Sequence, residues 1–433
     1  MRSHLLPAMT LLLLASACRS QPPDPAQGTQ KPTSTESSPP PPPIVTATDA
    51  SDTDAAEVVA EADAGAAEEP LEGTLFTKQV QGAFRVAGCG GSDDFIPPHV
   101  DKQIVDTHCG MLTGAYAEYK KEWLDVAGPF LAKLRPENLP TTLVYPFGGG
   151  DLVSALATYP DATDITTVSL EIAGDIRAID KADNRRLTQE LAQLRDHLGK
   201  LFLKAHSRTI NLDIETRGAV PGEAAYTMAA LVIHGYEPTS YRYFAFNSDG
   251  TLKWLTDEDI AKNKNQGREG PFANAEIRFR KVGDTSGKVR ILRHVAHDLS
   301  NASVGGRPGL IKFLESKGKP VSTMTKAASH LLWDDAGFSV IRDYLMTHTE
   351  WMISDTTGVP PRIAKKYGFV QDFYGQYEWP EPFGTVNNAD ATAFHEAFKT
   401  AKPISFRYGY PDNKSHGHIV VTHKPEVVTK TPP

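Results

Sequence analysis

The chain has 433 residues, of which 40% are hydrophobic and 23% are charged, and its formal net charge is −8 at pH 7. The segment 49–72 contributes nine negative charges and residues 1–48 sum to one positive charge, so residues 73–433 are neutral overall. A folded part without net charge has no long-range field to attract nucleic acid or anionic lipid, which argues against nucleic-acid binding.

The N-terminus has the composition of a bacterial secretion leader. Arg2 gives a basic start, and the apolar run Leu5–Ala15 is shorter than the roughly 20 residues of a membrane-spanning helix. Small residues lead into Cys18, and this arrangement resembles the lipobox of bacterial lipoproteins, whose cysteine becomes the lipidated first residue of the mature chain. The resemblance implies a signal peptide over residues 1–18, a palmitate-type lipid on Cys18 and, because Arg19 follows, delivery to the outer membrane. The alternative is an ordinary signal peptide with an incidental cysteine.

Residues 19–72 are predicted to form a disordered tether. The segment Gln21–Ala50 contains nine prolines among Ser, Thr and Gln, and alanine spaces the acidic tract that follows. Neither composition offers enough apolar surface to offset the conformational entropy lost on folding. A coil of this length spans roughly 40 Å on average, so it would hold a globular domain clear of a membrane surface.

The remaining cysteines are consistent with export. With Cys18 consumed by lipidation, Cys89 and Cys109 are left, twenty residues apart. An even pair in an oxidising compartment usually forms a bridge, so we expect a Cys89–Cys109 disulfide. Two cysteines alone are too few for a structural zinc site.

Residues 73–433 alternate between strand-like and helix-like patterns. In chain order, the patterns from residue 141 to 247 predict a strand at 141–147, a helix at 151–158, a strand at 165–171, helices at 176–204 and 224–234, and a strand at 240–247. A hairpin of two strands, 276–280 and 289–295, is predicted next. The last third is predicted to contain helices at 309–316, 326–332 and 338–347, a strand at 350–354, helices at 361–367 and 391–400, and strands at 404–410 and 418–422. This alternation favours an α/β fold with a Rossmann-like, mostly parallel sheet, helices on both faces and an inserted β-hairpin. We expect one globular domain, with a subdivision near residues 220–300 left open.

The stretch LVYPFGGGD, residues 143–151, places three glycines and an aspartate between a strand and a helix. Such a turn exposes backbone N–H groups at the positive end of the helix dipole and attracts anions. It matches neither the G-x-G-x-x-G nor the P-loop pattern, and the Asp151 carboxylate would itself occupy the anion position. Glu171 ends the next strand, where related folds hold ribose hydroxyls. The pair Asp151 and Glu171 resembles the S-adenosylmethionine site of class I methyltransferases, whereas the alternative for Asp151 is a helix cap.

A second turn, ISDTTG at residues 353–358, also follows a predicted strand. Open α/β sheets build their sites at strand C-termini, so Asp355 is a candidate base or ligand-binding acid; the alternative is a turn that caps the next helix. The candidate catalytic residues are therefore Asp151, Glu171 and Asp355. The predicted ligand pocket is lined by Gly148, Gly149, Gly150, Asp151, Glu171, Asp355 and Thr357.

The histidines do not predict a metal site. On the strand SHGHIVVTH, His416 and His418 share a face while His423 points the opposite way, and a catalytic metal needs a third ligand. His294 and His297 fall on opposite faces of another predicted strand. For lack of a third ligand we expect no metal. We also expect no cofactor, because nucleotide cofactors are scarce outside the cytoplasm.

Several segments together resemble an uncharacterised family of bacterial exported proteins. They are YPFGGGD (145–151), TKAASHLL with FSVIR (325–342), DTTGVPPR (355–362) and FYGQY (373–377). The family pattern is Y-P-F-x-G-x-D, K-A-A-S, a D-D-S-G-I-P-like turn and Y-G-x-Y, and the resemblance, over most of residues 120–420, implies kinship without an activity. Here Gly150 stands where the family has proline, and Thr356 replaces the second acid of the turn. If that acid pair is catalytic in the family, this chain is a reduced or inactive member.

These observations leave two functional classes open. A lipid-anchored envelope protein would bind an unknown small molecule or envelope partner, through the pocket or the aromatic segment 372–380, without turnover. An extracytoplasmic hydrolase would use Asp151, Glu171 or Asp355 as acid and base, and a degenerate or active S-adenosylmethionine-type protein is a further alternative. Catalysis requires two titratable groups within hydrogen-bond reach of one reacting atom, so the geometry of the carboxylates distinguishes the classes.

Overall fold

A computed structural model describes residues 71–204, 219–334, 336–377, 388–410 and 417–427. The expected leader, the lipidated Cys18 and the tether up to residue 70 lie outside the described residues and stay predictions. None of the helices in the described ranges combines the length and the apolar character needed to cross a membrane.

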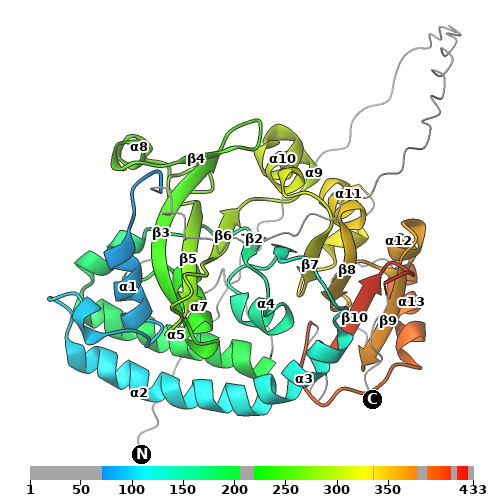
Figure 1. The fold of residues 1–433 in the computed structure, drawn as a ribbon, viewed down its shortest axis with the longest axis horizontal. Helices are drawn as coiled ribbons and strands as arrows, with labels where there is room; N and C mark the ends of the chain where they lie inside the picture. Colours follow the sequence, from blue (N-terminus) through cyan, green and yellow to red (C-terminus); the bar gives the residue numbers. More distant parts are fainter. Residues whose placement is uncertain (1–70, 205–218, 335, 378–387, 411–416, 428–433) are drawn as a thin grey trace, which may run out of the picture. The chain divides into compact units, whose positions relative to one another are not determined.

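The described residues are organised around one ten-stranded mixed sheet (Figure 1). In spatial order its strands are β4 (Leu252–Trp254), β3 (Tyr236–Phe246), β5 (Asn274–Lys281), β6 (Arg290–Ala296), β2 (Asp164–Ser169), β1 (Thr142–Pro146), β7 (Val321–Thr325), β8 (Thr349–Ser354), β10 (His418–His423) and β9 (Val370–Gly375). The central strands from β6 to β8 are parallel, and antiparallel strands extend the sheet on both sides. The predicted α/β class is confirmed, although the antiparallel share of the sheet is larger than expected.

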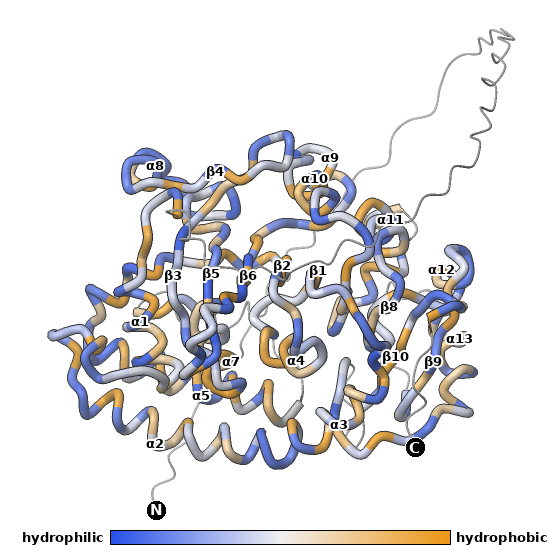
Figure 2. Tube along the Cα trace, viewed as in Figure 1, coloured by the Kyte–Doolittle hydropathy of each residue, from blue (hydrophilic) through white to orange (hydrophobic). Residues whose placement is uncertain are grey.

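Helices cover both faces of the sheet, as the sequence predicts. One face packs against α1 (Thr77–Val86), α2 (Lys102–Tyr119), α3 (Asp125–Leu134), α4 (Leu152–Thr158), α5 (Asn184–Lys204) and α7 (Gly222–Ile233), and the other against α10 (Gly309–Ser316), α11 (Ser339–His348) and α12 (Pro361–Lys366). The two-residue period of a strand sorts the side chains of β1 between them: Leu143 and Tyr145 belong to the first core and Val144 to the second. Figure 2 shows α4 as largely hydrophobic and the peripheral α8 (Asp257–Lys262) as hydrophilic.

The predicted hairpin is present and extends the sheet. Strands β5 and β6 pair antiparallel, with Ala275 opposite His294. Strand β3 pairs with β5, so the region for which a subdivision near residues 220–300 was left open contributes four strands to the common sheet. That region belongs to the same unit, Glu69–Pro433, as the other described residues.

Two predicted elements are wrong. Residues 326–332, expected as a helix, form an irregular loop that leads into a short 3-10 helix, Leu331–Trp333. The preceding segment VSTMT is the central strand β7, whose hydroxyl groups hide the apolar signal of a buried strand; Ser322, for example, donates to the carbonyl of Pro140 at 2.7 Å. Residues 404–410 form no strand, and Gly409 there has a positive φ of 77°.

Other elements differ in extent or were not expected. The predicted helix 176–204 begins as a 3-10 helix, Ile176–Lys181, and becomes α5 only from Asn184. No helix was expected between residues 77 and 134, where the structure has α1 to α3, and the edge strand β9 was also missed. At that edge α13 (Asn388–Phe398) packs its Phe394 and Phe398 against Phe373 of β9.

The order in which strands are added to the sheet changes side at β1. From β1 the chain passes through α4 to β2 on one side, whereas β7 and then β8 add to the other side. The carboxyl ends of β1 and β7 therefore form a topological switch point, where open α/β sheets place their binding crevices.

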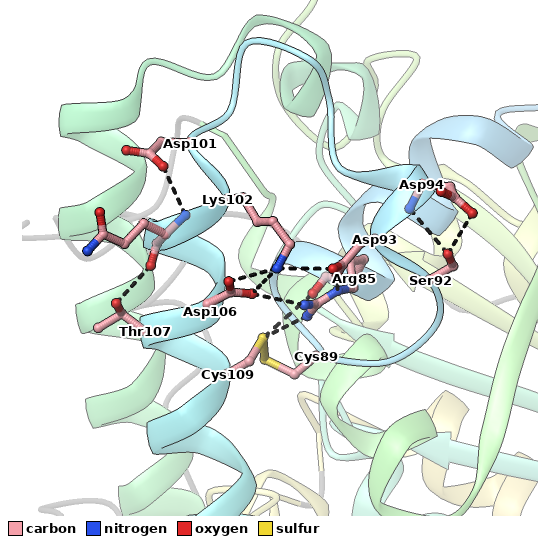
Figure 3. Close-up of polar contacts among 11 residues, drawn as sticks. Arg85, Cys89, Ser92, Asp93, Asp94, Asp101, Lys102, Asp106, Thr107 and Cys109 are labelled. Carbon is pink, nitrogen blue, oxygen red and sulfur yellow. Dashed lines mark hydrogen bonds and ion pairs between the residues drawn. A yellow bond between two sulfur atoms is a disulfide. The ribbon is translucent and has the colours of Figure 1, made fainter.

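A disulfide fastens the loop after α1 to α2. Cys89 and Cys109, predicted to be bonded, are joined in the structure with their Cα atoms 5.3 Å apart (Figure 3). The Arg85 guanidinium donates to Cys109 Sγ at 3.1 Å and to the carboxylate of Asp93 at 2.6 Å. Because Asp93 is largely exposed, that ion pair adds little, and the covalent link is the main constraint on this corner.

Replacing both cysteines by serine is predicted to lower the free energy of unfolding by about 3 kcal/mol, because the open chain regains the entropy of a loop of this length. Urea unfolding followed by circular dichroism would measure the loss. A matched control is wild-type protein under reducing conditions, which should show the same loss. Equal stability of oxidised and reduced protein would contradict the prediction.

Candidate functional site

The GGGD turn connects β1 to α4 in the way the sequence predicts. Two residues of the turn have left-handed backbones, Phe147 with φ 63° and Gly149 with φ 45°. Gly148 packs so tightly that a Cβ atom on it would lie 2.7 Å from the ring of Tyr145. Asp151 then caps α4, with its Oδ1 accepting a hydrogen bond from the Ser154 backbone N–H at 3.3 Å. The cap interpretation of Asp151 is therefore confirmed.

The other oxygen of Asp151 is held by a buried lysine from the neighbouring strand. Lys326, the residue after β7, places its Nζ 2.6 Å from Asp151 Oδ2 and donates to Ser154 Oγ at 2.6 Å. The Tyr145 hydroxyl donates to the same carboxylate oxygen at 3.0 Å. Burial and the adjacent carboxylate raise the pKa of Tyr145 well above its usual value, so it stays a donor. The Lys326 side chain is 2% exposed and that of Asp151 is 12% exposed, so the ammonium group is buried and the carboxylate is mostly shielded from solvent.

Sequence reasoning missed Lys326 because its segment was read as a helix. The only signal was its position in the K-A-A-S motif. In the structure the loop after it is strained: Ala327, Ser329 and His330 all have positive φ values, between 53° and 60°. Non-glycine residues held in this conformation cost free energy and cluster at functional sites and tight structural junctions.

Asp355 follows β8 and is surrounded by donors. Its Oδ1 accepts the backbone N–H of Thr357 at 2.9 Å and the Thr357 hydroxyl at 2.5 Å. Its Oδ2 accepts the backbone N–H groups of Ala327 and Tyr410, both at 2.8 Å. Burial raises the pKa of Asp355, while these hydrogen bonds act in the opposite direction. Asp355 is fully buried.

The structure thus brings two of the predicted site residues to one edge of the sheet. Asp151 and Asp355 are linked through consecutive residues, because Lys326 binds the first and the N–H of Ala327 binds the second. Thr357 also joins this network, since its hydroxyl accepts the N–H of Ala328 at 2.7 Å. The arrangement connects the ends of β1, β7 and β8 and leaves each carboxylate oxygen with a donor from the protein itself.

Glu171 lies after β2, the strand next to β1. Its carbonyl accepts a hydrogen bond from His294 Nε2 at 2.9 Å. The Nδ1 of His294 is 3.1 Å from the carboxylate of Glu223, at the start of α7, and both side chains are at most 5% exposed. Burial opposes the charged imidazole, but Glu223 and the Glu171 carbonyl outweigh it and raise the pKa of His294. This buried pair was not found from the sequence.

The two described histidines of the predicted strand, His418 and His423, have different polar neighbours. His418 Nε2 is 2.9 Å from the hydroxyl of Thr356, His423 Nε2 is 3.3 Å from Asp372, and His416 lies outside the described residues. Within the described ranges no group of three His, Cys, Asp or Glu side chains is placed to hold a metal ion.

Polar atoms without a partner collect on the β7–β10 side of this edge. His330 Nε2 and the indole N–H of Trp333 are buried and have no hydrogen-bond partner in the part of the chain that the structure describes. Burial lowers the pKa of His330 to about 4, so its ring is neutral at physiological pH. Buried groups of this kind mark places where water or a polar ligand completes the hydrogen bonding.

Comparison of the chain with protein-family models, with curated proteins and with solved structures gives no match. The role of the site is therefore inferred from the contacts and burial of its residues.

Replacing Asp355 by alanine is predicted to lower the free energy of unfolding by more than about 3 kcal/mol, because several buried donors lose their acceptor at once and each costs about 1–3 kcal/mol. Asp284, in the exposed hairpin turn, provides the control, and its alanine variant should stay within about 1 kcal/mol of wild type. Chemical denaturation of the two variants would test this. Equal effects would show that Asp355 is not a structural junction.

His294 gives a pH dependence with a defined sign. Because its folded pKa is raised, its contribution is complete below the unfolded value of about 6.5 and is lost as pH rises through the folded pKa. The stability difference between wild type and His294→Gln should therefore shrink as pH rises above neutrality. Denaturation curves of both proteins across this range would measure it. A difference that grows with pH would contradict the assignment.

Proposed function

We propose that this chain is a lipid-anchored cell-envelope protein whose α/β domain binds a ligand without turning it over. The observation that carries the proposal is the state of the two strand-end carboxylates. Every oxygen of Asp151 and Asp355 accepts hydrogen bonds from protein donors. A general acid or base needs an oxygen that can reach the substrate, and here these oxygens hold the fold together.

The hydrolase alternative is weakened by the same contacts. A pair of catalytic carboxyl groups would have to face a common space that admits water and substrate. Asp355 is fully buried, and Asp151 is tied to an ammonium group that is 2% exposed. Releasing either carboxylate would leave buried donors unpaired, which is costly.

The methyltransferase-like alternative has support from topology and opposition from charge. The order β6-β2-β1-β7-β8-β10-β9, with β10 antiparallel to its neighbours, is compatible with the class I methyltransferase-like Rossmann fold that the sequence weakly resembles. However, the Lys326 ammonium lies against Asp151 at the switch point. A sulfonium cofactor placed there would meet a positive charge and a carboxylate already neutralised. We therefore propose kinship in fold without the cofactor.

Placement in the envelope is supported by two independent features. The leader with Cys18 has the pattern of a lipoprotein signal. The Cys89–Cys109 disulfide fits an oxidising compartment. The partner would then be a small molecule or a component of the envelope.

A thermal-shift screen of the full chain tests the binding proposal. The panel should contain nucleosides, S-adenosylmethionine, sugars, small anions and divalent metals. We expect at least one compound to raise the melting temperature without being consumed, as mass spectrometry of the mixture would show. Chemical conversion of the bound compound, or S-adenosylmethionine copurifying with the native protein, would overturn the proposal.

The anchor gives a separate prediction. Replacing Cys18 by alanine should move the protein from the membrane fraction to the soluble fraction, because the acyl chain supplies the membrane affinity. Cell fractionation and metabolic labelling with a fatty acid would measure both effects. Unchanged membrane association with no labelled wild-type protein would show that Cys18 is not the anchor.

A further inference from the structure

A cavity of about 350 Å³ lies away from the Asp151–Lys326 pair, at the carboxyl ends of β3 and β6. Its wall includes the end of β3, the residue after β6, the loop before β5 and the first residues of α10, whose place above these strands is visible in Figure 1. The side chains that matter for its chemistry are Arg268, His297 and Arg307. None of them belongs to the network of Asp151 and Asp355.

His297 contributes a buried nitrogen that the protein leaves unused. The residue is 6% exposed, and its Nε2 has no hydrogen-bond partner within the described ranges. Its Nδ1 lies 2.7 Å from the carbonyl of Asp298, which can only accept, so Nδ1 carries the proton. Burial, with Arg307 and Arg268 nearby, outweighs Asp298 and lowers the pKa of His297. The neutral ring therefore has a buried acceptor, Nε2, without a partner among the described residues, on a side chain that lines the cavity.

The start of α10 adds backbone donors to the same cavity. The first N–H groups of a helix have no partner within the helix and favour anions. Gly309 and Leu310, which begin α10, both line the cavity. A side chain at Gly309 would be blocked, since a Cβ there would lie 2.5 Å from the carbonyl oxygen of Asn247. Glycine thus keeps the helix start close to the end of β3.

The arginines make the cavity positive on balance. Arg307 donates to Ser303 Oγ at 3.0 Å and lies 3.5 Å from the carboxylate of Glu269, which is 68% exposed. So long and exposed an ion pair contributes little, so Arg307 can exchange it for a ligand. Arg268 is the second cation, and Glu269 is the acidic group among the lining residues.

We propose that this cavity binds a small oxyanion that carries an O–H group, of which hydrogen phosphate is the simplest. The arginines and the start of α10 would bind the negative oxygens, and His297 Nε2 would accept the O–H. This inference rests on the proposed binding function and names the ligand class. A phosphomonoester of a lipid headgroup presents the same chemistry as the free ion, so both sources are tested.

Isothermal titration calorimetry of the full chain with inorganic phosphate and with sulfate is the test. Sulfate has the shape and charge of phosphate but no O–H at neutral pH, so phosphate should bind about tenfold more tightly, the effect of one hydrogen bond to a buried acceptor. Arg307→Gln and Arg268→Gln should each weaken phosphate binding about tenfold. Arg280→Gln, which removes an exposed arginine at the far end of β5, should leave it unchanged. His297→Leu should abolish the preference over sulfate, with its melting temperature as the folding control.

Equal affinity for phosphate and sulfate, or equal affinity of Arg307→Gln and Arg280→Gln, would overturn the inference. Absence of phosphate binding by the wild-type protein would also overturn the inference. If His297→Leu does not fold, the comparison of Arg268→Gln with Arg280→Gln still tests it. Titration with phosphatidylcholine vesicles that contain about one part in five phosphatidic acid separates the two sources of the phosphate group. Tighter binding to these vesicles than to free phosphate would support a lipid headgroup as the ligand. Tighter binding to free phosphate would support a soluble ion. If wild type binds another compound of the screen but not phosphate, the inference fails and the binding function stands.

Discussion

The ion pair between Asp151 and Lys326 is the constraint on which the rest of the carboxyl edge depends. A buried ion pair offsets its desolvation cost only when further hydrogen bonds satisfy both partners. Here the Tyr145 hydroxyl and the Ser154 N–H complete the carboxylate, and Ser154 Oγ accepts from the ammonium. The pair ties the β1–α4 turn to the loop after β7. Fixing Lys326 also fixes Ala327, whose N–H reaches Asp355, so three strand ends are held by one connected set of contacts.

The ion pair gives the glycine turn and the strand-end acids a structural role instead of a catalytic one. A glycine turn before a helix, followed by acids at strand ends, is where many α/β proteins place a cofactor or a catalytic pair. In this chain the same positions are filled by the protein's own lysine and backbone donors. Among the described residues, the groups left available lie elsewhere along the edge: the unpartnered Nε2 of His330 and the cavity beside His297. Binding functions are therefore better supported than acid–base chemistry at the switch point.

Local patterns predicted the parts of the site that depend on local chemistry. The strand, turn and helix around Asp151 and its role as a cap follow from glycine conformations and capping preferences. The turn at Asp355 likewise shows the expected bond to Thr357. The partners Lys326, Ala327 and Tyr410 could not be predicted, because they come from segments that meet only in the folded sheet. Strand β7 was missed because its Ser and Thr residues are buried, so the strand lacks an apolar signature. The Ser322 hydroxyl donates to the carbonyl of Pro140, and the hydroxyls of Thr323 and Thr349 pair with each other.

A double-mutant cycle on Asp151 and Lys326 tests the central claim most directly. The free energies of unfolding of Asp151→Ala, Lys326→Met and the double variant would be compared with wild type by urea denaturation. Breaking a buried pair from one side costs about 3–5 kcal/mol, and the double variant should lose less than the sum of the single losses, with a coupling of about 1–3 kcal/mol. Single losses within about 0.5 kcal/mol of wild type, or strictly additive losses, would contradict the account, because the two side chains would then not hold the sheet edge together.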